Sequence, residues 1–142
     1  MEQVPINLSA VLAAAMAKIF VESIWHGPLF GKVWMEWSGL TPDKIAAVKA
    51  KGMGKAHLIA LVSAVVMSYV LAHSLVFAAA YFKMAGVLAG VMCGFLNWLG
   101  FIAPVTLGTV LWEGKPWKLW LLLNSNYLVS LPIMGVILAL WK

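Results

Sequence analysis

The sequence predicts an all-α integral membrane protein, a bundle of four transmembrane helices that forms one domain over residues 1–142. Hydrophobic residues make up 63% of the chain and charged residues only 11%, which is too little polar surface for a soluble domain. Because the alternation typical of membrane strands is absent, the spans should be helices that satisfy their own backbone hydrogen bonds. Four apolar runs are long enough to span, at about 4–26, 56–82, 84–112 and 117–141.

The first apolar run is interpreted as a retained transmembrane helix. It follows Met1-Glu2-Gln3 and so lacks the positive start of a secretory signal. Gly27-Pro28 should end the regular helix, and the mixed segment 29–37 is expected to lie along the membrane surface. Thr41-Pro42-Asp43 then supplies a cap, a first-turn proline and an early acid. This pattern predicts a short amphipathic cytoplasmic helix between the first two spans.

The third apolar run contains Gly86-x-x-x-Gly90-x-x-x-Gly94, a smooth face that allows another helix to approach closely. That helix belongs either to the same chain or to a second copy. A tight turn near Lys83 should make the second and third spans antiparallel neighbours. Pro104 in the third span and Pro132 in the fourth each predict either a gate or a simple bend.

The lysines predict the orientation of the bundle. Most of them lie in the first and third loops or at their edges, whereas Lys83 and Lys142 flank the other side. The positive-inside rule therefore places these two loops in the cytoplasm and both termini on the non-cytoplasmic side. The net charge of +5 reflects this asymmetry, and the absence of arginine and of an exposed basic domain argues against a nucleic-acid partner.

Two sequence motifs indicate a known family. They are Trp25-His26-Gly27-Pro28-Leu29-Phe30-Gly31-Lys32-x-Trp34, followed by Ser38-Gly39-Leu40-Thr41, and Trp98-Leu99-Gly100-Phe101-x-Ala103-Pro104. In these motifs, and over nearly its full length, the chain resembles small bacterial integral-membrane proteins catalogued as domain of unknown function 1761. The resemblance implies a four-helix protein of the bacterial inner membrane, with no activity or catalytic residue to carry over. In that family the positions of His26 and Glu22 usually hold other residues, which would make these charges peculiar to this chain.

The best functional lead is the stripe Lys18-x-x-x-Glu22-x-x-x-His26 in the first span. Four-residue spacing places the three groups on one helix face, where charge is costly unless it is paired or reaches water. At ~1.5 Å per residue, Lys18 and Glu22 lie in the cytoplasmic half of the bilayer. The same arithmetic places Asn124 and Asn126 of the fourth span at a similar depth, with Tyr127 nearby.

These depths leave two interpretations open. In the first, Lys18, Glu22, Asn124 and Asn126 share one polar cavity that binds an ion or polar solute or relays protons. In the second, the Lys18 ammonium reaches the cytoplasmic interface, and the asparagines and Tyr127 only form hydrogen bonds between helices. His26 then belongs to the interfacial belt.

His73 is predicted to lie buried in the opposite half of the membrane. A lone histidine there ligates haem or a pigment, senses pH, or donates to a neighbouring carbonyl. The three histidines lie at different depths, so no shared metal site is expected. No nucleophile, base and orienting acid occur together, so the sequence does not predict an enzyme. Cofactors are not expected, with haem or pigment at His73 as the exception.

Two functions are compatible with these patterns. The first is a small transporter or channel-like protein for an ion, proton or small polar solute, acting as a homo-oligomer because four helices alone hardly enclose a path. The second is a structural or accessory subunit of a larger membrane complex, docked through the glycine face and holding haem or pigment at His73.

Overall fold

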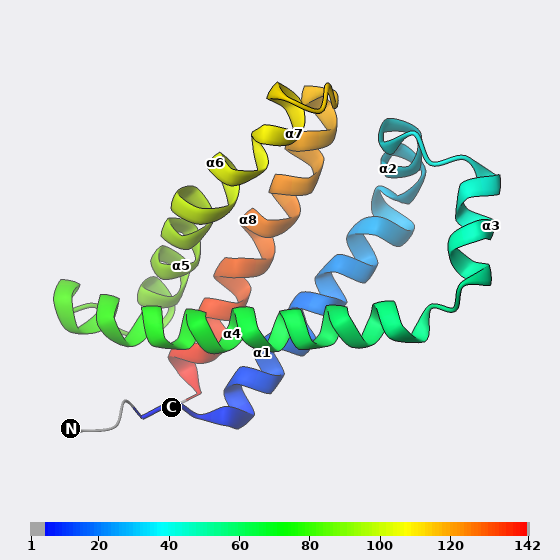
Figure 1. Ribbon diagram of the computed structural model, residues 1–142. Coiled ribbons are helices and arrows are strands. Elements are labelled where there is room, and N and C mark those ends of the chain that lie inside the picture. The colour runs from blue at the N-terminus through cyan, green and yellow to red at the C-terminus, as the bar shows by residue number, and fades with distance from the viewer. Residues whose placement is uncertain (1–4, 142) are drawn as a thin grey trace.

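The structure is a computed structural model that describes residues 5–141, and all regular structure in these residues is helical (Figure 1). Four helical stretches are long and apolar enough to cross a membrane: Leu8–Leu29, Gly54–Phe82, Gly86–Leu111 and Trp117–Leu140. The predicted all-α membrane fold with four spans is confirmed. The start of the first span and the end of the fourth lie at the same end of the bundle in Figure 1.

The first span begins later than predicted. Helix α1 covers Leu8–Ile24, and its N-cap is Asn7, whose side-chain oxygen accepts from the backbone N–H groups of Ser9 and Ala10 at 3.0 and 3.2 Å. The predicted start at residue 4 lies outside the described residues, and residues 5–7 precede the helix. The cap explains the difference, since it satisfies the first free N–H groups of a helix that starts at Leu8.

Gly27 and Pro28 end the regular helix as predicted. They lie in a π-helical turn, η1 (Trp25–Leu29), where Gly27 has non-helical dihedral angles (φ −105°, ψ −107°). Helix α2 (Gly31–Ser38) follows and ends at Gly39. Helix α3 (Pro42–Ala50) is the predicted short connecting helix, with Thr41 as its N-cap, but none of its residues is buried. Of its residues only Ile45 is partly buried, and the others are exposed.

Helix α4 (Gly54–Phe82) crosses the other spans obliquely, whereas α1, α5 and α8 run more nearly alongside one another (Figure 1). Its turn at Lys83 has a positive φ of 53°. The second and third spans do touch, but the oblique crossing means that they do not pair antiparallel along their length. The main neighbour of the third span is instead α8 (Trp117–Leu140), which lies between it and α1.

The third span is a series of short helices. Helix α5 (Gly86–Asn97) leads into a π-helical turn, η2 (Trp98–Ile102), and then into α6 (Ala103–Thr106) and α7 (Gly108–Leu111). The π-helical turn ends two residues before Pro104, which has no N–H to continue the regular hydrogen-bond ladder. Helix α8 by contrast continues through Pro132.

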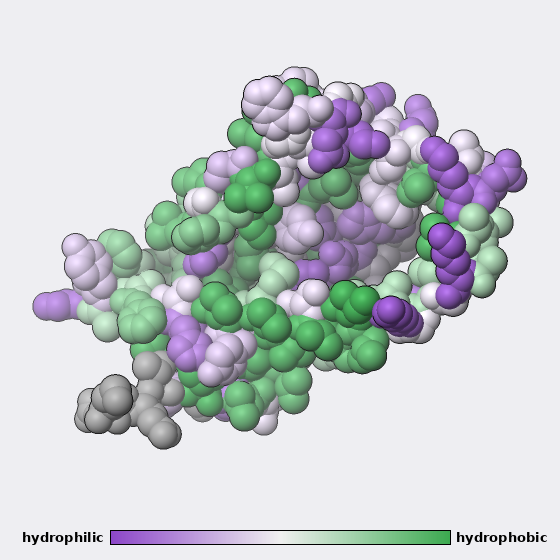
Figure 2. Space-filling model, viewed as in Figure 1, coloured by the Kyte–Doolittle hydropathy of each residue, from purple (hydrophilic) through white to green (hydrophobic). Residues whose placement is uncertain are grey.

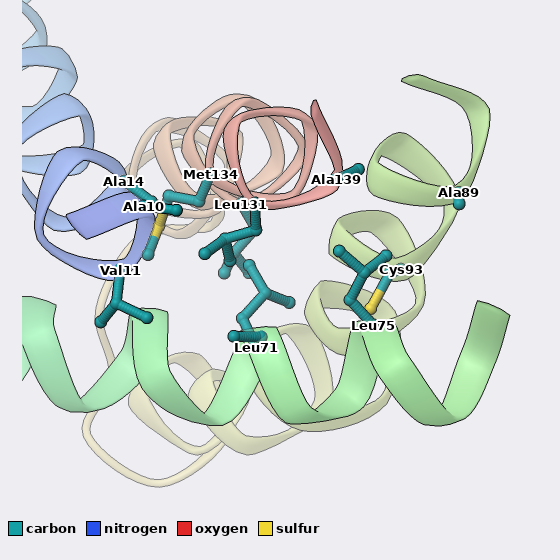
Figure 3. Packing of buried hydrophobic residues seen from close by; sticks show 12 residues of the cluster. Ala10, Val11, Ala14, Leu71, Leu75, Ala89, Cys93, Leu131, Met134 and Ala139 are labelled. Atoms are coloured by element: carbon teal, nitrogen blue, oxygen red, sulfur yellow. The ribbon is translucent and has the colours of Figure 1, made fainter. Parts of the chain in front are cut away.

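The core lies where α1, α4, α5 and α8 meet. Figure 3 shows Leu71 of α4 pointing toward Leu131 of α8, with Ala14 of α1 and Met134 close by. Ala14 and Met134 are completely buried. The hydroxyl of the buried Ser68 donates to the carbonyl of Val11 at 2.8 Å and so joins α4 to α1. In lipid, such close packing and interhelical hydrogen bonds hold helices together.

Candidate functional site

The centre of the candidate site is the ion pair of Lys18 and Glu22. Both side chains project from α1 one turn apart, and Lys18 Nζ lies 2.8 Å from Glu22 Oε2. Lys18 is only 5% exposed, whereas the side chain of Glu22 is 31% exposed. The ammonium is therefore held inside the protein, and the carboxylate is its counter-charge.

Tyr127 of α8 completes this pair from the facing helix. The Lys18 ammonium lies 6.0 Å from the centroid of the Tyr127 ring, at the outer limit of a cation–π contact. The three residues Lys18, Glu22 and Tyr127 are called the charged cluster below. The structure thus brings together three of the polar residues that the sequence placed at a similar depth.

The molecule is hollowed between α4 and the spans behind it, and hydrophilic side chains line the floor of this hollow (Figure 2). Helix α3 and the beginning of α4 border the hollow on one side (Figure 1). Their lysines are all exposed: Lys44, Lys49, Lys51 and Lys55. The border of the hollow is therefore positively charged.

His26 lies beside the charged cluster without contacting its charges. Its Nδ1 is 3.1 Å from the backbone carbonyl oxygen of Glu22, and its ring meets the Trp34 ring edge-on at 5.0 Å. The neighbouring Trp25 donates through its indole N–H to the carbonyl of Leu122 at 3.1 Å. The end of the first span is thus fixed to α2 and to α8, and His26 belongs to that packing.

Asn124 does not join the charged cluster. Its Nδ2 donates to the Thr106 hydroxyl of α6 at 2.9 Å and to the Trp120 carbonyl at 3.1 Å. The Trp120 indole N–H also donates to this hydroxyl, at 3.0 Å. The prediction of one cavity is therefore wrong for Asn124, which forms a hydrogen bond between helices, as the second interpretation expected.

Asn126 lies on the other side of α8. A helix turns about 100° per residue, so two residues place its side chain about 200° from that of Asn124. Asn124 faces α6, so Asn126 points away from the third span. Asn126 is 1% exposed, and neither atom of its amide has a hydrogen-bond partner among residues 5–141.

The glycine face packs inside the chain. A Cβ atom at Gly90 would lie 2.5 Å from the carbonyl carbon of Gly135, and one at Gly94 would lie 2.5 Å from the nitrogen of Pro132. Gly86 differs from both, because a Cβ there would meet nothing within 4 Å. Gly86 begins α5 with a positive φ of 64° and is not part of the contact. Gly135, which the sequence patterns did not single out, completes it.

His73 is half-buried on α4. Its Nδ1 is 2.9 Å from the carbonyl oxygen of Tyr69, and the two rings lie 4.5 Å apart. Among the described residues no three His, Cys, Asp or Glu side chains are grouped so as to hold a metal ion. The role of His73 as a cofactor ligand stays a prediction from the sequence.

Two pockets of about 500 and 440 Å³ lie elsewhere in the molecule. The first lies among α1, α4 and α8 near Trp141, and the second lies between α4 and the η2 region near Asn97. Both are lined mostly by apolar side chains, as expected of crevices that face lipid tails. Neither is lined by the charged cluster.

A comparison with protein-family models gives one match, described as protein of unknown function (DUF1761), over residues 9–139. No curated protein and no solved structure matches the chain. The match runs from the second residue of α1 to the last turns of α8 and thus includes all four spans. The chain therefore belongs to the DUF1761 family of proteins of unknown function.

Proposed function

We propose that this protein moves an ion, a proton or another small polar solute across the membrane, as a transporter or channel-like protein, and that the solute passes at the charged cluster. The observation that carries the proposal is the burial of Lys18 against a Glu22 carboxylate that remains 31% exposed. A charge inside the bilayer is costly, and such residues are usually found on a solute or proton pathway. A carboxylate that is still accessible gives a solute a place to bind beside a fixed positive charge.

The surroundings of the cluster support the same proposal. The hollow in Figure 2 is bordered by the lysines of α3 and α4, on the side that the positive-inside rule assigns to the cytoplasm. We propose that the solute reaches the charged cluster from this side. Positive charge at this border would concentrate anions near the charged cluster. The orientation assumed here has both termini on the non-cytoplasmic side.

We further propose that the working unit is a homo-oligomer. Every residue from Gly54 to Ser63 is exposed, so within residues 5–141 no helix covers the first part of α4. The polar hollow lies next to this part of α4, and lipid tails cannot solvate its polar floor. A second copy placed against the first part of α4 would close the hollow toward lipid and leave it open toward water.

Flux through lipid vesicles tests the function. Vesicles with the full chain are compared with empty vesicles, using a pH-sensitive dye for protons and ion-selective measurements for Na⁺, K⁺ and Cl⁻. We expect the wild-type chain to raise one of these fluxes and Glu22→Gln to lower it by about tenfold or more, equivalent to about 1.4 kcal/mol. Glu36→Gln is the matched control, because Glu36 is exposed on α2 and its loss should leave flux unchanged.

Two results would overturn the proposal. One is wild-type flux equal to that of empty vesicles for all four ions. The other is full flux in a folded Glu22→Gln variant, which would make the ion pair a purely structural feature.

A further inference from the structure

We infer that Asn126 and Ser130 form a second polar site in the middle of the bundle, which binds water or a neutral molecule of similar size that both donates and accepts hydrogen bonds. Both residues are buried, since Asn126 is 1% exposed and Ser130 is 0% exposed. The Oδ1 and Nδ2 atoms of Asn126 and the hydroxyl of Ser130 have no hydrogen-bond partner among the residues that the structure describes.

The two side chains share one face of α8, because they are four residues apart. Counted from the centre of the Trp117–Leu140 helix, they lie within roughly 4 Å of its midpoint. Because neither side chain reaches the surface, neither lipid nor a second copy of the chain can be its hydrogen-bond partner. A small molecule inside the bundle would satisfy these three atoms.

The chemistry of the three atoms defines the ligand. The amide supplies one acceptor and a donor group, and the hydroxyl supplies either role. A buried water typically forms about three hydrogen bonds to such atoms, which matches the number available here. Neither residue carries a charge, and the two side-chain oxygen atoms are too few to replace the hydration shell of a bare cation, so the site suits a neutral molecule.

The position of this site extends the polar region beyond the charged cluster. Tyr127, which faces the Lys18 ammonium, is the neighbour of Asn126 in α8, and Ser130 lies one turn further from the cytoplasmic side. If the solute path at the charged cluster exists, water at Asn126 and Ser130 continues it to the middle of the membrane, and that step alone rests on the proposed function. The water site itself stands without it.

Asn124 is a matched control within the same helix. Both asparagines are buried, at 2% and 1% exposure, but the Asn124 amide donates to Thr106 and to the Trp120 carbonyl. The full chain, labelled with ¹⁵N-asparagine and placed in lipid bilayers, is studied by solid-state NMR with magnetisation transferred from water. We expect the Asn126 side-chain amide to receive water magnetisation at least about tenfold faster than that of Asn124.

Two variants complete the test. Asn126→Leu identifies the signal by removing it, and Ser130→Ala removes one of the three polar atoms and should slow the transfer to Asn126. An Asn126 amide as isolated from water as that of Asn124 would overturn the inference, as would an Asn126 amide hydrogen-bonded to another protein group. Because no flux is measured, a failure here is distinct from a failure of the Glu22→Gln test.

Discussion

Gly90 of α5 and Gly135 of α8 meet backbone to backbone, so closely that a Cβ atom on Gly90 would lie 2.5 Å from the Gly135 carbonyl carbon. This contact joins the third and fourth spans, which form the most extensive helix pair of the fold. The glycine face is therefore occupied within one chain. A bulky residue at Gly90 would disturb the fold before it disturbed any association between chains.

The first prediction concerns this contact. Gly90→Ala should lower the free energy of unfolding by about 1–3 kcal/mol, because the added methyl group forces two backbones apart. Thermal unfolding in detergent measures the loss. Gly100→Ala is the control, since a Cβ atom there would meet nothing within 4 Å. Equal stability of the two variants would contradict the packing of α5 on α8.

The second prediction concerns how much each of the two buried asparagines contributes to the stability of the fold. Asn124→Leu removes the hydrogen bonds to Thr106 and to the Trp120 carbonyl and should cost about 0.6–1.7 kcal/mol. Asn126→Leu removes an amide without a protein partner among the described residues, so it should be neutral or stabilising. Denaturation of the two variants in the same detergent decides this. A larger loss for Asn126→Leu than for Asn124→Leu would contradict this prediction.

The Lys18–Glu22 pair could be predicted from the sequence because it depends only on helix geometry. Residues four apart on one helix must be neighbours, whatever surrounds them. The four spans were predictable for a similar reason, since the length and composition of each run decide them. Asn7 as the cap of α1 was missed, although asparagine before an apolar run is a typical start signal.

The prediction that Asn124 shares a cavity with Lys18 was wrong because it used the depth of each residue in the membrane but not the direction in which its side chain points. The rise per residue places Asn124 and Asn126 at one level, but the rotation of the helix points them to opposite sides. The helix that each asparagine faces depends on how the third span packs against α8. The pattern of residues within a single helix does not contain that information. Thr106 and Trp120, the actual partners of Asn124, were therefore not found.

The third prediction tests the second copy beside α4. Ile59 is 55% exposed in the part of α4 that lacks a neighbour. In a Cys93→Ala background, which removes the buried free thiol, Ile59→Cys should form a disulfide-linked dimer when native membranes are oxidised. Phe77→Cys, also exposed but near the other end of α4, should form little dimer. Absence of dimer at each of the four positions 58–61 would exclude the proposed contact, because successive residues point about 100° apart and these four exposed positions therefore cover all sides of the helix.

The fourth prediction tests whether the Lys18–Glu22 ion pair contributes only to stability or also to solute flux. Lys18→Met and Glu22→Gln each leave one member of the pair without its counter-charge and should each cost about 1–3 kcal/mol, less than a fully buried pair because Glu22 is partly exposed. The double variant carries no charge at either position and should recover most of that stability. Its flux should nevertheless remain as low as that of Glu22→Gln, because the solute would still lack the carboxylate. Wild-type flux in the stable double variant would show that the pair only holds the fold together.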